Sequence, residues 1–231
     1  MSAPTIDRPA RAGVHSRAAA WGWLGGATAA YTVASLVLLH GVLGDLDDRA
    51  PLHGTGDVAQ MTWFQSWTAW AIAHAHDPFV SHAINAPHGV NLMWNTAMPL
   101  AGAIMAPATL AFGPLTTVNL LFILGPITTA LTARWWLARH VDSEFARLAS
   151  GAIVGFGPFV AAHLGGHLNF TVLTLVPVIL RLGEDVLWRT PGRRLPAVLL
   201  GFSLAGQALL SEEVLLLVVG GGIVMWLAAV V

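Results

Sequence analysis

Asp57 is the first candidate for a catalytic group because of the residues on either side of it. It follows Gly54 and Gly56 and precedes an apolar, aromatic-rich stretch. A carboxylate partly withdrawn from water in such a setting holds a proton more readily and can act as a general base. The structural alternative is that Asp57 caps a helix that begins just after it.

A second group of acids lies a few residues upstream. Asp45 and Asp48, together with Asp57, offer the oxygen ligands that a divalent cation such as Mg²⁺ or Mn²⁺ takes in proteins. The alternative is a solvated acidic loop. Arg49, in the same stretch, is a candidate contact for a phosphate group, or else a partner of its acidic neighbours.

Three ionisable residues further along the chain are candidates for binding a substrate. His163 and His167 flank a pair of glycines at the end of an apolar run, and they would share a face if the helix continued. Glu212 begins a short acidic turn between two apolar runs. Ionisable residues at the edge of a membrane core are functional suspects. Interfacial histidines and a solvated glutamate are the structural alternatives.

The composition indicates that a membrane surrounds the elements that position these residues. The chain is 55% hydrophobic and 10% charged, with a net charge of −1, whereas soluble domains carry about 25% charged residues. The net charge argues against a nucleic-acid partner. The absence of cysteine excludes disulfides and cysteine nucleophiles. We therefore predict an integral membrane protein whose partners include membrane lipids.

The arginines predict how the chain is oriented. Ten of the eleven fall in three clusters, which alternate with acidic loops, and the chain has no lysine. Because cytoplasmic loops collect Lys and Arg, we expect a multi-pass protein of the plasma (inner) membrane. Its N-terminal tail, residues 1–18, is then cytoplasmic, and residues 44–115 form an outer loop. The clusters are Arg8, Arg11 and Arg17; Arg134, Arg139 and Arg147; and Arg181, Arg189, Arg193 and Arg194.

The apolar runs predict an all-α polytopic membrane protein with about six transmembrane helices. The predicted spans are residues 19–43, 116–133, 148–163, 170–183, 195–210 and 214–231. Two further runs, 58–76 and 98–112, are predicted to be interfacial helices of the outer loop. Because the last run has no polar end, we expect the module at 19–231 to be the N-terminal part of a longer protein.

Tryptophans mark one face of the first interfacial helix. Trp63, Trp67 and Trp70 follow the spacing of one helical face. This stripe is typical of a membrane anchor, and a platform for a sugar is the alternative.

Short motifs in the outer loop and the third span add a resemblance. Residues 19–215 resemble, in layout and motifs, the N-terminal half of membrane glycosyltransferases of the GT-C superfamily, especially a bacterial group of large multispan proteins. The motifs are residues 56–60 (Gly-Asp-Val-Ala-Gln), 63–67 (Trp-Phe-Gln-Ser-Trp), 77–79 (Asp-Pro-Phe), 85–92 (Asn-Ala-Pro-His-Gly-Val-Asn-Leu), 112–114 (Phe-Gly-Pro) followed by 119–120 (Asn-Leu), 157–159 (Gly-Pro-Phe), His163 and 166–168 (Gly-His-Leu).

The resemblance implies an enzyme that transfers a sugar from a polyprenyl-phosphate donor on the outer face of the membrane. It implies that Asp57 is the base or holds a divalent cation. Full family members are more than twice as long, so it also implies that this chain alone is inactive. The sugar and the acceptor stay unidentified. The residues leave two alternatives. One is a transporter or lipid flippase, and the scarcity of charges within the spans counts against it. The other is a non-catalytic scaffold.

Overall fold

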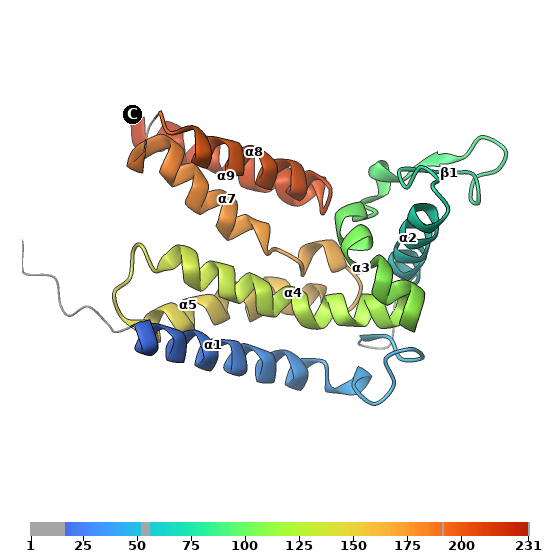
Figure 1. The fold of residues 1–231 in the computed structure, drawn as a ribbon, viewed down its shortest axis with the longest axis horizontal. Coiled ribbons are helices and arrows are strands. Elements are labelled where there is room, and N and C mark those ends of the chain that lie inside the picture. The colour runs from blue at the N-terminus through green and yellow to red at the C-terminus, as the bar shows by residue number, and fades with distance from the viewer. Residues whose placement is uncertain (1–16, 52–55, 191, 231) are drawn as a thin grey trace, which may run out of the picture.

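The computed structural model describes residues 17–51, 56–190 and 192–230, and most of these residues are helical (Figure 1). The all-α prediction is confirmed. The strands within the described residues are β1 (Val80–Ser81) and β2 (Val90–Asn91), which form a two-residue antiparallel pair. Residues 1–16 of the predicted tail at 1–18, and Gly54, lie outside the described residues.

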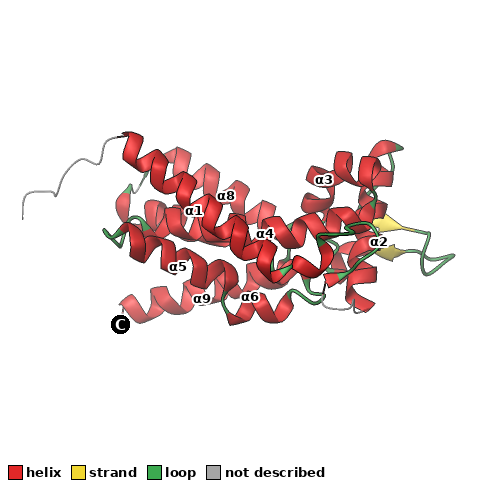
Figure 2. Cartoon of the chain, turned by 90° about the horizontal axis from the view of Figure 1, so that it is seen from below, coloured by secondary structure: helices red, strands yellow, loops and turns green. Residues whose placement is uncertain are grey.

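Most of the helices run back and forth along the long axis of the molecule (Figures 1 and 2). Three short helical turns, η1 (His40–Val42), η4 (Leu168–Phe170) and η5 (Asp185–Arg189), follow helices of this bundle. The bundle helices are α1 (Arg17–Leu38), α4 (Pro114–Leu137), α5 (Glu144–Phe156), α6 (Pro158–His163), α7 (Leu175–Glu184), α8 (Arg194–Ala208) and α9 (Glu212–Val230).

The predicted outer loop gathers at one end of the bundle, on the right of Figure 1. It holds α2 (Gly56–Ala73), the β1–β2 pair, η3 (Leu92–Asn95) and α3 (Pro99–Phe112). Both predicted interfacial helices are present as helices. Phe64 of α2 and Phe122 of α4 are fully buried in the core that joins this part to the bundle.

Within the bundle, α5 packs closely on α4 because two glycines face it. A Cβ added at Gly155 would lie 2.5 Å from the carbonyl oxygen of Pro126, and one at Gly151 would lie 2.7 Å from that of Ala130. The two glycines are four residues apart, which is the spacing that allows helix backbones in membranes to approach each other. The spacing of Gly151 and Gly155 is visible in the sequence and could have predicted this close contact.

Two helical segments in the described residues are long and apolar enough to cross a membrane. They are Pro114–Leu137 and the run Glu144–His163, which α5 and α6 form together. Among the other predicted spans, α7 has 10 residues and α8 has 15, against about 20 for a spanning helix.

Several predicted boundaries are wrong for local reasons. The predicted span 148–163 is interrupted at Gly157, because Pro158 begins α6 and its nitrogen has no hydrogen to donate to the preceding turn. The predicted span 170–183 is an α-helix only from Leu175. The first helix ends at Leu38 and is followed by a 3₁₀ turn, not by further α-helix to residue 43.

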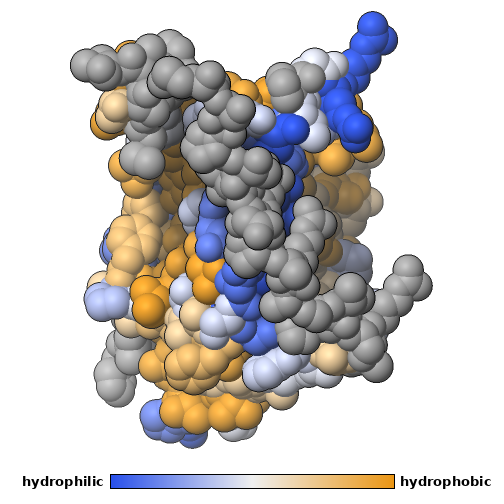
Figure 3. Space-filling view, turned by 90° about the vertical axis from the view of Figure 1, so that its left-hand side faces the viewer, coloured by the Kyte–Doolittle hydropathy of each residue, from blue (hydrophilic) through white to orange (hydrophobic). Residues whose placement is uncertain are grey.

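The described members of the second and third arginine clusters gather at the end of the bundle opposite to α2 and α3. Figure 3 looks onto that end and shows a band of hydrophilic residues with hydrophobic residues on both sides. Arg134 and Arg147 both pair with Glu144, at 2.5 and 2.6 Å. Arg139 pairs with Asp185 at 2.7 Å. These ion pairs hold the ends of α4, α5 and α7 together.

Candidate functional site

Asp57 and His167, two of the residues singled out from sequence, lie against each other. The Oδ2 atom of Asp57 is 3.5 Å from the Nε2 atom of His167. Asp57 belongs to the first turn of α2, so it lies inside the helix and not before it as a cap. His167 lies in the turn between α6 and η4. A carboxylate and an imidazole from distant parts of the sequence therefore meet at the α2 end of the bundle.

This pair is open to its surroundings. The side chains of Asp57 and His167 keep 49% and 54% of their exposure. A ligand can therefore reach both groups, and the attraction between them is screened by solvent. A carboxylate next to an imidazole can move a proton to or from a bound hydroxyl group.

His163 extends the pair through aromatic contacts. Its ring centroid is 5.3 Å from that of His167 and 4.8 Å from that of Phe170. Its Nδ1 atom lies 2.7 Å from the carbonyl oxygen of Phe159. The helix ends at His163 and does not continue to His167, yet the turn through Gly165 and Gly166 still brings the two histidines together.

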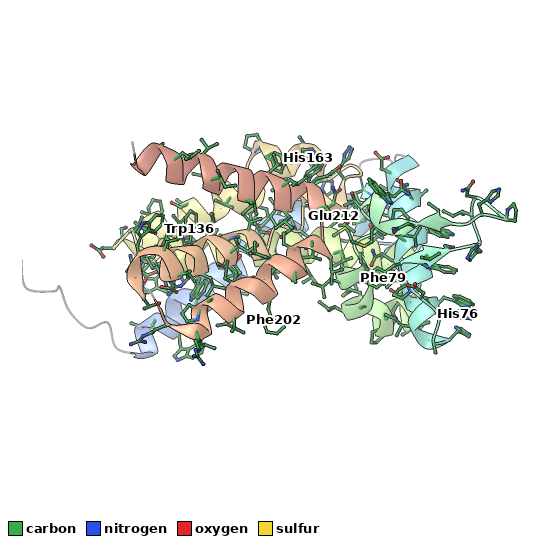
Figure 4. All side chains as sticks on the ribbon, turned by 90° about the horizontal axis from the view of Figure 1, so that it is seen from above. His76, Phe79, Trp136, His163, Phe202 and Glu212 are labelled. Carbon is green, nitrogen blue, oxygen red and sulfur yellow. The ribbon has the colours of Figure 1, made fainter. Side chains whose placement is uncertain are left out.

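The acidic turn at the start of α9 reaches the same end of the bundle, but through Glu213 and not through Glu212. The amide nitrogen of Asn169 donates to the Oε2 atom of Glu213 at 3.1 Å, and Asn169 is buried. Figure 4 shows Glu212 and His163 at this end of the bundle. No hydrogen bond or ion pair of the Glu212 side chain is present among the described residues. Sequence reasoning missed the link between Asn169 and Glu213.

Arg49 and Asp48 lie beside a different hollow. They line an open pocket of roughly 670 Å³ at the end of α1, together with Leu38, His40 and Pro51. In the described structure Arg49 forms no ion pair with Asp47 or Asp48, so that predicted alternative is not realised. Its main chain is held instead, because the buried amide of Asn119 donates to the carbonyl oxygens of Leu46 and Arg49, both at 2.8 Å.

The residues predicted for a divalent cation do not gather in the part of the chain that the structure describes. No group of three His, Asp or Glu side chains there could hold a metal ion. Asp45 instead shares a hydrogen bond with Asp47, which raises the pKa of Asp45. Asp57 has His167 beside it. The donor set Asp45, Asp48 and Asp57 therefore does not fit a bound cation as it stands.

The comparisons with known proteins give this chain no relative. No protein-family model, curated protein or solved structure matches it significantly.

Proposed function

We propose that the chain lies in the plasma (inner) membrane with six spans and with its arginine-rich end in the cytoplasm. The spans are α1, α4, α5 with α6, the segment 170–183 that includes most of α7, α8 and α9. The support is a broad apolar surface on the outside of the bundle. Phe202 of α8 is 74% exposed and Ile153 of α5 is 70% exposed, and Val37 and Leu216 are exposed on α1 and α9. Exposed apolar surface of this extent is suited to lipid.

On this topology the end that carries Asp57 faces away from the cytoplasm. There the protein transfers a sugar from a polyprenyl-phosphate donor to an acceptor hydroxyl. The observation that carries this proposal is the contact between Asp57 and His167 at the end of the bundle opposite to the arginines. The isoprenoid chain of such a donor would lie along the apolar helices, and its phosphate would lie at their ends. The resemblance of residues 19–215 to GT-C glycosyltransferases supports the same activity.

The proposed reaction uses Asp57 as the base. Its carboxylate takes the proton of the acceptor hydroxyl while that oxygen bonds to the anomeric carbon of the sugar. The bond from the anomeric carbon to the phosphate oxygen breaks, and the lipid phosphate leaves with the electron pair. His167 is a positioning residue that holds the carboxylate. No step is routed through a cation, because the predicted donor set is not assembled.

The test is sugar transfer by membranes that contain the full-length gene product. The membranes receive radiolabelled undecaprenyl-phosphate sugars of several kinds, and labelled acceptor is measured. Asp57→Asn should lower the rate about a hundredfold or more, as expected for loss of a general base. The matched control is Asp142→Asn, the same change in an exposed loop at the opposite end, which should leave the rate unchanged. Transfer by Asp57→Asn at the wild-type rate would contradict the proposal.

A further inference from the structure

A second hollow lies at the other end of α2, away from Asp57. It has a volume of roughly 550 Å³, which is in the range of about 300–1,000 Å³ that small-molecule sites occupy. Its wall comes from the C-terminal part of α2 and from the segment around β1. The lining residues are Trp67, Trp70, His76, Asp77, Val80, His82 and Ala83.

The tryptophan stripe of α2 forms a row of adjacent rings that ends in this pocket. The rings of Trp63 and Trp67 are 5.9 Å apart and nearly parallel, and those of Trp67 and Trp70 are 5.1 Å apart. Trp70 also stacks on His74 and His76, each at 4.8 Å. Trp63 and Trp67 pack against the core, whereas Trp70 is 40% exposed. The stripe therefore does not present all three indoles to a membrane.

The polar atoms around the pocket have unused hydrogen-bonding capacity. The indole nitrogen of Trp67 has no partner in the described structure, but it is fully buried and is not open to the pocket. Asp77 accepts a hydrogen bond from the Phe79 nitrogen through Oδ1, and no partner of its Oδ2 atom is present among the described residues. The lining therefore offers a carboxylate acceptor and the imidazoles of His76 and His82, each of which can donate and accept hydrogen bonds.

This combination selects among ligand classes. Asp77 is the one charged residue of the lining, so an anion would meet a carboxylate and no cation. A quaternary ammonium group needs a free aromatic face, but the faces of Trp70 are stacked on other rings. The edges of aromatic rings carry partial positive charge and suit oxygen atoms. Hydroxyl groups, which donate and accept, match the mixed set of donors and acceptors.

We infer that this pocket binds a neutral saccharide, and that it is the acceptor subsite of the proposed transferase. The role as acceptor subsite rests on the proposed function, whereas the binding of a saccharide does not. Trp67 and Trp70 lie 10 and 13 residues after Asp57 on the same helix, which corresponds to about 15–20 Å along its axis. Figure 4 likewise shows His76 well apart from His163 and Glu212. An acceptor longer than one sugar would reach from the pocket to the reacting pair.

The test measures binding without any transfer. The purified full-length protein in nanodiscs is mixed with methyl glycosides of glucose, mannose, galactose and arabinose at millimolar concentration, and saturation-transfer NMR reports which of them bind. At least one should bind to the wild type. Trp70→Ala and Asp77→Asn should weaken that binding about tenfold, the effect of losing one good contact. Asp77→Asn keeps the oxygen that accepts from Phe79, so it tests the carboxylate without disrupting the turn.

Two controls separate this inference from the proposed function. Trp94→Ala removes an exposed indole from the same end of the molecule but outside the pocket, and it should bind as the wild type does. Asp57→Asn should also keep glycoside binding while it loses transfer. Absence of binding to every glycoside, or equal binding by Trp70→Ala, Asp77→Asn and Trp94→Ala, would overturn the pocket assignment and leave the transferase proposal standing. Glycoside binding together with full transfer by Asp57→Asn would overturn the transferase proposal and leave the pocket assignment standing.

Discussion

At the scale of single residues, Asn119 explains how the loop after α1 is held in place. Its side chain is fully buried in α4 and donates to two carbonyl oxygens of that loop. Each of these two hydrogen bonds contributes about 0.5–1.5 kcal/mol to stability. The loop carries Asp45, Asp48 and Arg49, so one amide determines where three predicted site residues lie.

Asn119→Ala should therefore destabilise the protein by about 1–3 kcal/mol, because two carbonyl groups lose their donor. The measurement is thermal unfolding of the purified protein in detergent. Thr132→Ala is the control, since the Thr132 hydroxyl bonds only to carbonyl groups of its own helix. If both variants unfolded at the same temperature, Asn119 would not hold the loop.

The sequence identified the residue types of the candidate site but not all of its contacts. Asp57 and His167 were both singled out, the first by its glycine-rich surroundings and the second by its place at the end of an apolar run. Their contact depends on how α2 lies beside the α6–η4 turn, and no local pattern specifies that. For the same reason Glu212 was chosen where Glu213 makes the contact with Asn169.

At the scale of elements, the close approach of α5 to α4 depends on two glycines. A methyl group at Gly155 would press on the carbonyl oxygen of Pro126 and on the Cβ atom of Ala130. Backbone atoms of a packed helix cannot move aside cheaply. The α5 and α4 helices would have to separate.

Gly155→Ala should accordingly lower the free energy of unfolding by about 1–3 kcal/mol. Gly201→Ala on α8 is the matched control, because a Cβ there meets nothing within 4 Å. It should be neutral or stabilising, since alanine favours the helix. Chemical unfolding of both variants in detergent measures the difference. Equal effects at both sites would show that the α4–α5 contact is not close.

The ion pair between Arg139 and Asp185 joins the ends of α4 and α7 and should be sensitive to acid. The hydrogen bond from Arg139 lowers the pKa of Asp185 below its ordinary value of 3.8. A lowered pKa in the folded state stabilises the protein above that ordinary value, and the contribution is lost as the pH falls through the lowered pKa.

Asp185→Asn should thus lower stability by up to about 1 kcal/mol near neutral pH, and the gap to the wild type should close below about pH 4. Thermal unfolding as a function of pH measures this. Asp142→Asn, in the exposed loop nearby, should show no such gap. A difference between Asp185→Asn and the wild type that persisted unchanged into acid would contradict the assignment.

Apolar runs predicted that helices exist more reliably than where they end. The predicted helix at 98–112 is close to the observed Pro99–Phe112. The predicted span 148–163 misses the break at Gly157, although the following proline marks it. Periodicity reports which residues are apolar, whereas a helix end depends on caps and on tertiary contacts such as that of Asn169 with Glu213.

At the scale of the whole molecule, two ends of opposite chemistry are joined by helices with apolar outer surfaces. One end carries paired arginines, and the other carries Asp57, His167 and the aromatic pocket. The proposed reaction and the proposed subsite both require the second end to face away from the cytoplasm. This sidedness is the central claim.

Single cysteines test it most directly, because the chain has none of its own. His88→Cys places a thiol in the exposed segment between β1 and β2, and Asp142→Cys places one in the exposed loop between α4 and α5. Intact cells are treated with a maleimide that does not cross membranes. We predict that residue 88 is labelled, and that residue 142 is labelled only after permeabilisation. Labelling of residue 142 but not of residue 88 in intact cells would contradict the account.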